Sequence, residues 1–222
     1  MLDKAVAVLE AAAGAPVGLG DLVEGTGLPR ATAHRLAVAL ETHRLLARDP
    51  DGRWTPGPRL AELARSAPDP LLTAAGPVLA RLRDRTGESA QLYRRDGDDR
   101  VCVAAAERTS GLRTFVAPGT RLPMTAGSGA QVLSAWAGED GLPPGARFGP
   151  RTLAEVRRRG WAYSVAQREA GVASVSAPVR DHSGHVVAAI SVSGPIERMG
   201  RRPGPRLAPL VTAAASALSA RL

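Results

Sequence analysis

Apolar residues recur every three or four positions along the first 41 residues, which predicts three short helices. The first covers residues 2–13, and the second lies in LGDLVEGTG, where Gly25 and Gly27 end it. A third helix begins at Pro29, whose missing N–H would have no partner in a first turn, and runs to about Glu41. Its inward stripe is Ala33, Leu36, Ala37 and Leu40. The residues left facing outward are Arg30, Thr32, His34, Arg35 and Val38.

This order of a short helix, a glycine-containing turn and a second amphipathic helix is typical of a helix-turn-helix unit. The next stretch, LLARDPDGRWT, predicts a hairpin with strand residues 45–48, a turn at 50–52 and a return strand at 53–55. A hairpin directly after the third helix is a wing, and Trp54 is expected to pack it onto the core. The pattern therefore predicts a winged helix-turn-helix domain over residues 1–66.

Strands and helices are mixed in the remainder of the chain. The segment SAPDP at 66–70 is a proline-interrupted joint, and a helix follows from Leu71 to Thr86. Two hairpins are predicted in QLYRRDGDDRVCVAAAE and VASVSAPVRDHSGHVVAAISVSG, and LRTFV at 112–116 predicts a further strand. Helices are expected in MTAGSGAQVLSAW, in LAEVRRRG and at the C-terminus. The fold class is α+β, with a linker and linker helix at 67–86 and a second domain at 87–222.

The composition narrows the class of protein. The chain has 222 residues, 44% of them hydrophobic, which is enough for two domains with cores. A single cysteine and four histidines exclude a disulfide framework and a cysteine-based zinc finger, and a reducing cytoplasm is the expected location. Asp3 and Glu10 interrupt the first apolar run, so it is not expected to be a signal peptide, and no apolar run approaches the length of a membrane span. No metal and no cofactor are expected.

The charge is unevenly distributed in the first domain. The net charge of the whole chain is +8, but residues 1–29 carry one Lys against four acidic residues, whereas residues 30–65 carry seven Arg against four. A polarised small domain with this motif order predicts a double-stranded DNA binder, against the alternative of a three-helix bundle with a solvated basic face. Base edges are expected to be read by Thr32, His34 and Arg35 beside Arg30, while phosphates are contacted by Arg44, Arg48 and Arg53.

Small polar residues in the second domain predict a ligand pocket. Residues 125–129 lie where a loop enters a helix, so their backbone N–H groups suit a carboxylate, assisted by the helix dipole. Four serines alternate along the second hairpin, which puts their hydroxyls on one side of the sheet: Ser174, Ser176, Ser191 and Ser193. The alternative is that small strand residues only allow close helix packing.

Several other chemistries fit less well. TAGSGAQ lacks the Gly-Lys-Ser/Thr of a phosphate-binding loop, and Ser128 is not in a Gly-x-Ser-x-Gly elbow. Asp181, His182 and His185 have a metal-like spacing but flank a turn, where such residues are usually solvated. Cys102 alternates with valines and is expected to be inert. No catalytic set is predicted, so the chain is not expected to be an enzyme.

The chain resembles the IclR-type bacterial transcriptional regulators. The motifs that carry the resemblance span nearly the whole sequence in order: GLPRATAHRL, RDPDGRWTPGPRLAEL, GTRLPMTAGSGAQVLSAW, LAEVRRRGWAYSVAQREAGVASVSAPVRD and VVAAISVSGP. The resemblance implies a GAF-like effector-binding domain after the winged helix-turn-helix. Thr125, Ala130-Gln131 and Ser174 stand where the family often has His, Gly-Lys and Cys. The LPMTAGS…AQVL version is similar to an actinobacterial subgroup that regulates leucine biosynthesis and wider amino-acid metabolism.

The resemblance also implies which residues meet an effector. The family positions that contact small carboxylates match Ser128, Gly129, Ser174, Ser191 and Ser193. Together with the loop and strand pattern, the predicted pocket is Met124, Thr125, Gly127, Ser128, Gly129, Ser174, Ser176, Ser191 and Ser193. Arg113, Arg121 and Arg168 are further candidates for pairing a carboxylate, although solvated arginines are common in so arginine-rich a chain.

These features predict a ligand-responsive DNA-binding regulator. It is expected to bind a pseudo-palindromic operator as a homodimer or a dimer of dimers, with residues 1–16 and 70–86 as the dimer contacts that the resemblance implies. The effector is expected to be a small carboxylate or an amino acid. The alternatives are a constitutive DNA-binding protein with a C-terminal assembly domain, whose pocket would be filled by its own side chains, and a small-molecule enzyme with a DNA-binding appendage.

Overall fold

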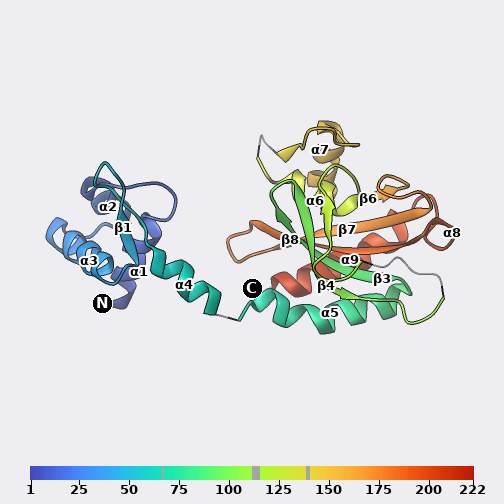
Figure 1. The fold of residues 1–222 in the computed structure, drawn as a ribbon, viewed down its shortest axis with the longest axis horizontal. Coiled ribbons are helices and arrows are strands. Elements are labelled where there is room, and N and C mark those ends of the chain that lie inside the picture. Colours follow the sequence, from blue (N-terminus) through green and yellow to red (C-terminus); the bar gives the residue numbers. More distant parts are fainter. Residues whose placement is uncertain (67, 112–115, 139–140) are drawn as a thin grey trace. The chain divides into compact units, whose positions relative to one another are not determined.

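The computed structural model describes residues 1–66, 68–111, 116–138 and 141–222, and the chain forms two units, Met1–Pro68 and Asp69–Leu222 (Figure 1). The helix predicted after the joint belongs to the second unit. Each unit has a core of its own, as expected for separate domains.

The first unit contains the predicted helix-turn-helix. Its helices are α1 (Leu2–Ala11), α2 (Leu19–Thr26) and α3 (Arg30–Thr42). Gly27 ends α2 in the left-handed conformation at φ 65°, whereas Gly25 lies inside the helix, so the prediction that Gly25 ends it was wrong. Pro29 precedes α3 in an extended conformation instead of occupying its first turn. The core comprises Val8, Ala12, Leu22, Ala37, Leu40, Leu46 and Trp54.

The wing follows α3 as predicted. Strands β1 (Leu46–Arg48) and β2 (Trp54–Pro56) pair antiparallel, and Gly52 makes the turn at φ 77°. The backbone of Val17 also pairs with that of Trp54, so the segment between α1 and α2 flanks the wing. A helix that the sequence analysis did not predict, α4 (Pro58–Ser66), comes next.

In its described residues, the second unit is built on one antiparallel sheet of six strands, in the spatial order β5-β4-β3-β8-β7-β6. The two predicted hairpins are its centre. They consist of β3 (Ser89–Asp96) with β4 (Asp99–Ala106), and β7 (Val172–Arg180) with β8 (Val186–Pro195). The outer strands are the short β5 (Arg121–Pro123) and β6 (Ala162–Val165). The strand predicted at 112–116 lies mostly outside the described residues.

Helices cover both faces of this sheet (Figure 1). On one face α5 (Pro70–Thr86) and α9 (Gly204–Ser219) pack on alternate residues of the central strands, including Leu92, Val175 and Ile190. On the other face lie α6 (Ser128–Ala135) and α7 (Pro150–Arg159). Ser174, Ser176, Ser191 and Ser193 occupy the positions between those apolar residues, so they point toward α6, as their alternation predicted.

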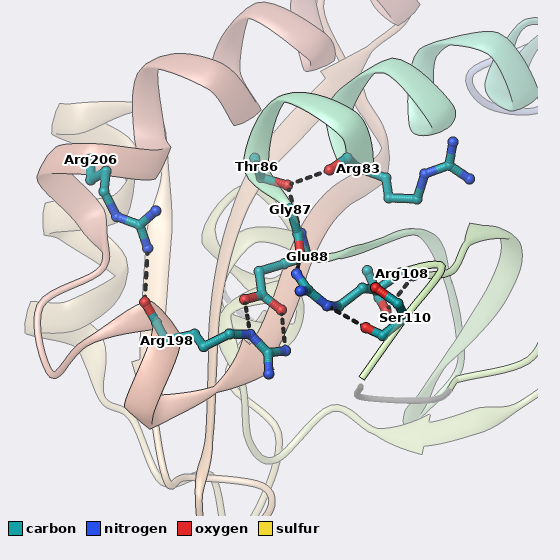
Figure 2. Close-up of polar contacts among 9 residues, drawn as sticks. Arg83, Thr86, Gly87, Glu88, Arg108, Ser110, Arg198 and Arg206 are labelled. Carbon is teal, nitrogen blue, oxygen red and sulfur yellow. Dashed lines mark hydrogen bonds and ion pairs between the residues drawn. The ribbon is translucent and has the colours of Figure 1, made fainter. Parts of the chain in front are cut away.

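A buried ion pair closes one corner of the second unit (Figure 2). Glu88, only 4% exposed, accepts from Arg198 Nε at 2.6 Å and from Arg198 Nη2 at 2.7 Å. Arg198 belongs to α8 (Ile196–Met199), directly after β8. A Cβ on Gly194 would lie 2.3 Å from Glu88 Oε2, so a glycine is needed there. The pair therefore joins the start of β3 to the end of β8.

Within the described residues, no helix combines the length and apolar character that crossing a bilayer requires.

Candidate functional site

The outward face of α3 carries the predicted base-reading residues. Arg30, His34 and Arg35 are exposed, and Thr32 is half-buried. Neither Arg30 nor Arg35 is in an ion pair with any residue of the described segments. Both guanidinium groups at the N-terminal part of α3 are therefore available to an outside partner.

The arginines of the wing are differently placed, because each lies against carboxylates of its own domain. Arg44 pairs with Glu62 at 2.8 Å and Arg48 with Glu41 at 3.2 Å. Arg53 pairs with Asp49 and with Asp51, both at 2.9 Å. All three arginines are exposed, so these pairs can exchange with other anions.

His34 and Arg48 both contact the ring of Trp54. The His34 ring meets it edge-on, with 6.0 Å between ring centroids, and the Arg48 guanidinium lies 4.1 Å from its centroid. Trp54 is buried, as predicted, and its Nε1 donates to Glu41 Oε2 at 3.1 Å. The His34 side chain thus lies on the wing side of α3.

In the second unit, serines from four elements converge at the N-terminus of α6. Ser128 Oγ lies 2.6 Å from Ser174 Oγ and 2.7 Å from Ser176 Oγ, and Ser164 Oγ lies 2.9 Å from Ser174 Oγ. Ser176 also bonds to Ser191 across the β7–β8 pair. Gly127, at φ 97°, begins α6 in a conformation that other residues rarely adopt, and this turn brings Ser128 against the sheet.

A cavity of about 30 Å³ opens beside these serines. Its walls include six of the nine predicted pocket residues, namely Gly127, Ser128, Gly129, Ser174, Ser191 and Ser193. The other three are not in its walls. Met124 is fully buried in the apolar cluster between the sheet, α6 and α7, where a long apolar side chain packs best. Thr125 binds Arg147 N through its carbonyl oxygen, and Ser176 lies behind Ser128 and Ser191.

The walls also contain residues that the sequence analysis did not predict, above all Arg100 on β4. Its side chain is 3% exposed, with the guanidinium 5.5 Å from the centroid of the Tyr93 ring. Burial lowers the pKa of Arg100 to about 10, so it remains a cation at neutral pH. Tyr93, Ser164, Arg168, Glu169 and Val172 complete the lining.

The remaining candidates have partners or lie elsewhere. Arg168, a predicted candidate, is in the cavity wall and pairs with Glu169 at 3.1 Å. Arg121 is outside the cavity and pairs with Asp96 at 2.6 Å and Asp99 at 3.0 Å. Arg113 lies outside the described residues.

Two other features of the second unit carry no reactive group. Within the described residues, Asp181, His182 and His185 are not part of any cluster of three potential metal ligands. Burial raises the pKa of Cys102 to about 11, so the thiol is protonated at neutral pH.

Comparison with known families decides the class of protein. The family described as "IclR helix-turn-helix domain" matches residues 1–50, and "Bacterial transcriptional regulator IclR C-terminal" matches residues 67–143 and 150–220. The chain belongs to the IclR family. It is a DNA-binding transcriptional regulator, as predicted, and members of the family are regulators, not enzymes. Regulators of the IclR family bind small-molecule effectors and are typically oligomeric.

Individual relatives align with this chain over most of their length. The regulator BhcR of Paracoccus denitrificans is 30% identical, with 89% of this chain and 78% of the relative covered. A solved IclR-family regulator from a Rhodococcus species is 30% identical with a TM-score of 0.74, covering 99% of this chain and 92% of that one. A solved IclR homologue from Microbacterium hydrocarbonoxydans, 26% identical with a TM-score of 0.60 and 100% and 98% coverage, is complexed with 4-hydroxybenzoate. The winged helix-turn-helix and the α+β second domain are thus confirmed.

Proposed function

We propose that the chain is a ligand-gated regulator that binds a small carboxylate or an amino acid in the serine-lined cavity and controls genes of amino-acid metabolism, such as those of leucine. On the DNA, Thr32, His34 and Arg35 read base edges beside Arg30. Arg44, Arg48 and Arg53 contact phosphates in exchange for their carboxylate partners.

The observation that carries this proposal is the convergence of hydroxyl groups on a helix N-terminus. Ser128 and its serine partners surround the first turn of α6, where Ser128 N donates to Ser164 Oγ at 3.2 Å and where the helix dipole favours an anion. Serine hydroxyls both donate and accept, so they can exchange their mutual hydrogen bonds for bonds to a carboxylate. The bound carboxylate of the homologue from Microbacterium hydrocarbonoxydans supports a carboxylate effector for this chain as well.

The proposed metabolic role rests on a different feature. The motif LPMTAGS…AQVL is similar to that of the actinobacterial regulators of leucine biosynthesis. An effector from the same branch of metabolism would let the regulator respond to the state of the pathway. Gating requires that the effector bind one arrangement of the two α3 helices of a dimer more tightly than another arrangement.

One observation favours a second candidate function, a constitutive DNA-binding protein with an assembly domain. The cavity is about 30 Å³, close to the space of one water molecule, and the serine hydroxyls satisfy one another. In the ligand-gated function this network must open to admit the effector. In the constitutive function it stays closed.

The test is fluorescence anisotropy of the full chain on a labelled fragment from upstream of its own gene. Titrations are made at two salt concentrations, with and without leucine, methionine and 2-oxo acids. We expect tight, salt-sensitive binding that one class of ligand shifts. Tight binding that no ligand changes would favour the constitutive function, and no binding to that or neighbouring promoters would contradict the proposed operator.

A further inference from the structure

The carboxylate of Glu41, near the C-terminal end of α3, accepts hydrogen bonds from both strands of the wing. Each of its two oxygens accepts from Arg48 Nε on β1 at 3.2 Å. Its Oε2 also accepts from Trp54 Nε1 on β2 at 3.1 Å. One side chain of α3 therefore binds the two strands of the wing together and holds them against the helix.

The guanidinium of Arg48 is held on three sides. Its Nε donates to Glu41, its Nη1 donates to the carbonyl oxygen of Gly52 at 2.6 Å, and its central carbon lies 4.1 Å from the centroid of the Trp54 ring. Its remaining nitrogen, Nη2, donates to no residue of the described segments. Because a guanidinium is planar and rigid, fixing Nε and Nη1 also fixes the direction of Nη2.

The pair of Arg44 and Glu62 has a different geometry. Glu62 accepts from Nη2 of Arg44 at 2.8 Å, so this carboxylate lies at the outer end of its arginine, where a phosphate would also bind. Glu41 instead binds Nε of Arg48 and leaves an outer nitrogen unoccupied. A phosphate thus competes with Glu62 for Arg44, whereas Arg48 can bind Glu41 and a phosphate at the same time.

We infer that Glu41 is a positioning residue for DNA binding, which holds Arg48 so that Nη2 donates to a backbone phosphate. This inference rests on the proposed function and refines one of its contacts, because Arg48 keeps its carboxylate partner on DNA while Arg44 and Arg53 exchange theirs. An acid close to a DNA-binding surface ordinarily weakens binding by repelling phosphates. Glu41 strengthens it, because an arginine that is already fixed loses less side-chain entropy on binding.

The experiment is fluorescence anisotropy of the full chain on the labelled fragment from upstream of its own gene, at several salt concentrations. Glu41→Ala removes both acceptor oxygens, and Glu41→Gln keeps one. The matched control is Glu62→Ala, the same change at a helical carboxylate that pairs with Arg44. Arg48→Met and the double variant with Glu41→Ala complete a double-mutant cycle.

We expect Glu41→Ala to bind about tenfold more weakly at about 0.1 M salt, the contribution of about one phosphate contact. Its slope of log affinity against log salt should be smaller by about one for each bound chain. Glu41→Gln should lose less affinity, and Glu62→Ala should bind as tightly as the wild type or up to about fivefold more tightly. In the Arg48→Met background, Glu41→Ala should cause no further loss, because no guanidinium remains to be positioned.

The outcomes separate this inference from the proposed function. If Glu41→Ala binds as tightly as the wild type or more tightly, the inference is wrong while the proposed contacts of α3 stand. A loss of affinity with an unchanged salt slope, or an equal loss in the Arg48→Met background, would identify Glu41 as a structural residue of the wing and also overturn it. If the wild type binds neither this fragment nor neighbouring promoters, both the inference and the proposed operator fail.

Circular dichroism at the assay temperature checks that each variant is folded. If Glu41→Ala is not, Glu41→Gln carries the same comparison with the wild type. It should bind more weakly and with a smaller salt slope, and an affinity equal to that of the wild type would overturn the inference.

Discussion

Individual carboxylates neutralise the wing arginines that we propose to contact DNA. Asp51 is 73% exposed and accepts from Arg53, which Asp49 already neutralises. We predict that Asp51→Asn tightens DNA binding by up to about fivefold, because an exposed ion pair contributes about 0.2–1 kcal/mol and its acid also repels phosphates. Fluorescence anisotropy at two salt concentrations would measure this.

Asp98→Asn is the matched control for Asp51→Asn, because it makes the same charge change at an exposed turn of the other unit. The gain from Asp51→Asn should shrink as salt rises, as expected for an electrostatic effect. Equal affinities of Asp51→Asn, Asp98→Asn and the wild type at low salt would contradict a restraining role of Asp51.

Sequence and structure agree on residues whose role follows from periodicity and differ where distant segments meet. The alternation of serines in VASVSAPVRD and VVAAISVSG was sufficient to place four hydroxyls on one face of the sheet. Arg100 could not be found in this way, because its burial depends on Gly127 and Gly129, which are distant in sequence. A signal was nevertheless present, since Arg100 alternates with Cys102 on a strand whose following residues, 101–106, are all apolar.

At the level of elements, a close backbone contact positions the wing against the end of α3. A Cβ on Gly57 would lie 2.2 Å from the carbonyl oxygen of Arg44 and 2.7 Å from its carbonyl carbon. We predict that Gly57→Ala destabilises the first unit by about 1–3 kcal/mol, the usual cost of overpacking, because backbone atoms cannot turn aside as a side chain can. Hydrogen exchange of peptides from the wing should be faster in the variant.

Gly14→Ala is the control for Gly57→Ala, because a Cβ on Gly14 meets nothing within 4 Å. Unchanged exchange in the wing of Gly57→Ala would show that the contact can relax. Exchange in the second unit should be the same in all three proteins.

The N-terminus of α5 depends on Asp69. Its carboxylate accepts from Leu71 N at 3.0 Å and from Leu72 N at 3.4 Å, and it also pairs with Arg94. Burial alone would raise the pKa of Asp69, but the hydrogen bonds and the charge of Arg94 outweigh it and lower the pKa below its usual 3.8. The charged form is thus favoured by folding, so its stabilisation is present above the pKa of the unfolded chain and is lost as the pH falls through the depressed pKa.

Two variants of Asp69 separate the cap from the charge. Asp69→Ala should reduce the free energy of unfolding by about 0.5–2 kcal/mol at pH 7, the usual cost of a lost cap, and Asp69→Asn by less, since the amide oxygen still accepts. Denaturant titration from pH 7 to pH 3 would measure both. The difference between wild type and Asp69→Asn should narrow toward the acid end, and a constant difference would exclude a role of the charge.

Helices with one regular stripe of apolar residues could be predicted from the sequence. Elements that depend on pairing with a neighbouring strand could not. The helices that became α1, α3 and α5 follow from apolar spacing and from Gly87, which ends α5 at φ 71°. The four-residue β6 was missed because so short a stretch is defined by its pairing with β7 and has no clear periodicity of its own. Its Ser164, which completes the serine network, was missed with it.

Over the whole second unit, the cavity and the chain connection to the DNA-binding unit share β3. Ser193 in the cavity wall donates to Gln91 on β3 at 3.1 Å, and β3 begins at the corner that Glu88 and Arg198 close. Gly87 joins that corner directly to α5, through which the chain continues to the first unit. An effector that reorganises the serines would therefore act on a strand that is continuous with this helix.

Operator binding as a dimer is predicted from the size of the proposed reading surface. One α3 presents Arg30, Thr32, His34 and Arg35, too few base contacts for operator-level affinity, and a two-fold symmetric assembly supplies a second set at fixed spacing. We predict that a pseudo-palindromic fragment binds at least about 100-fold more tightly than a fragment of equal length with one half-site scrambled, as expected when the second contact becomes intramolecular.

Inserting about five base pairs between the half-sites should remove this gain in affinity, because half a helical turn places the half-sites on opposite faces of the duplex. Anisotropy measures the affinities and analytical ultracentrifugation the stoichiometry, expected to be two or four chains per duplex. One chain per duplex with equal affinity for the intact and the scrambled fragment would contradict dimeric reading.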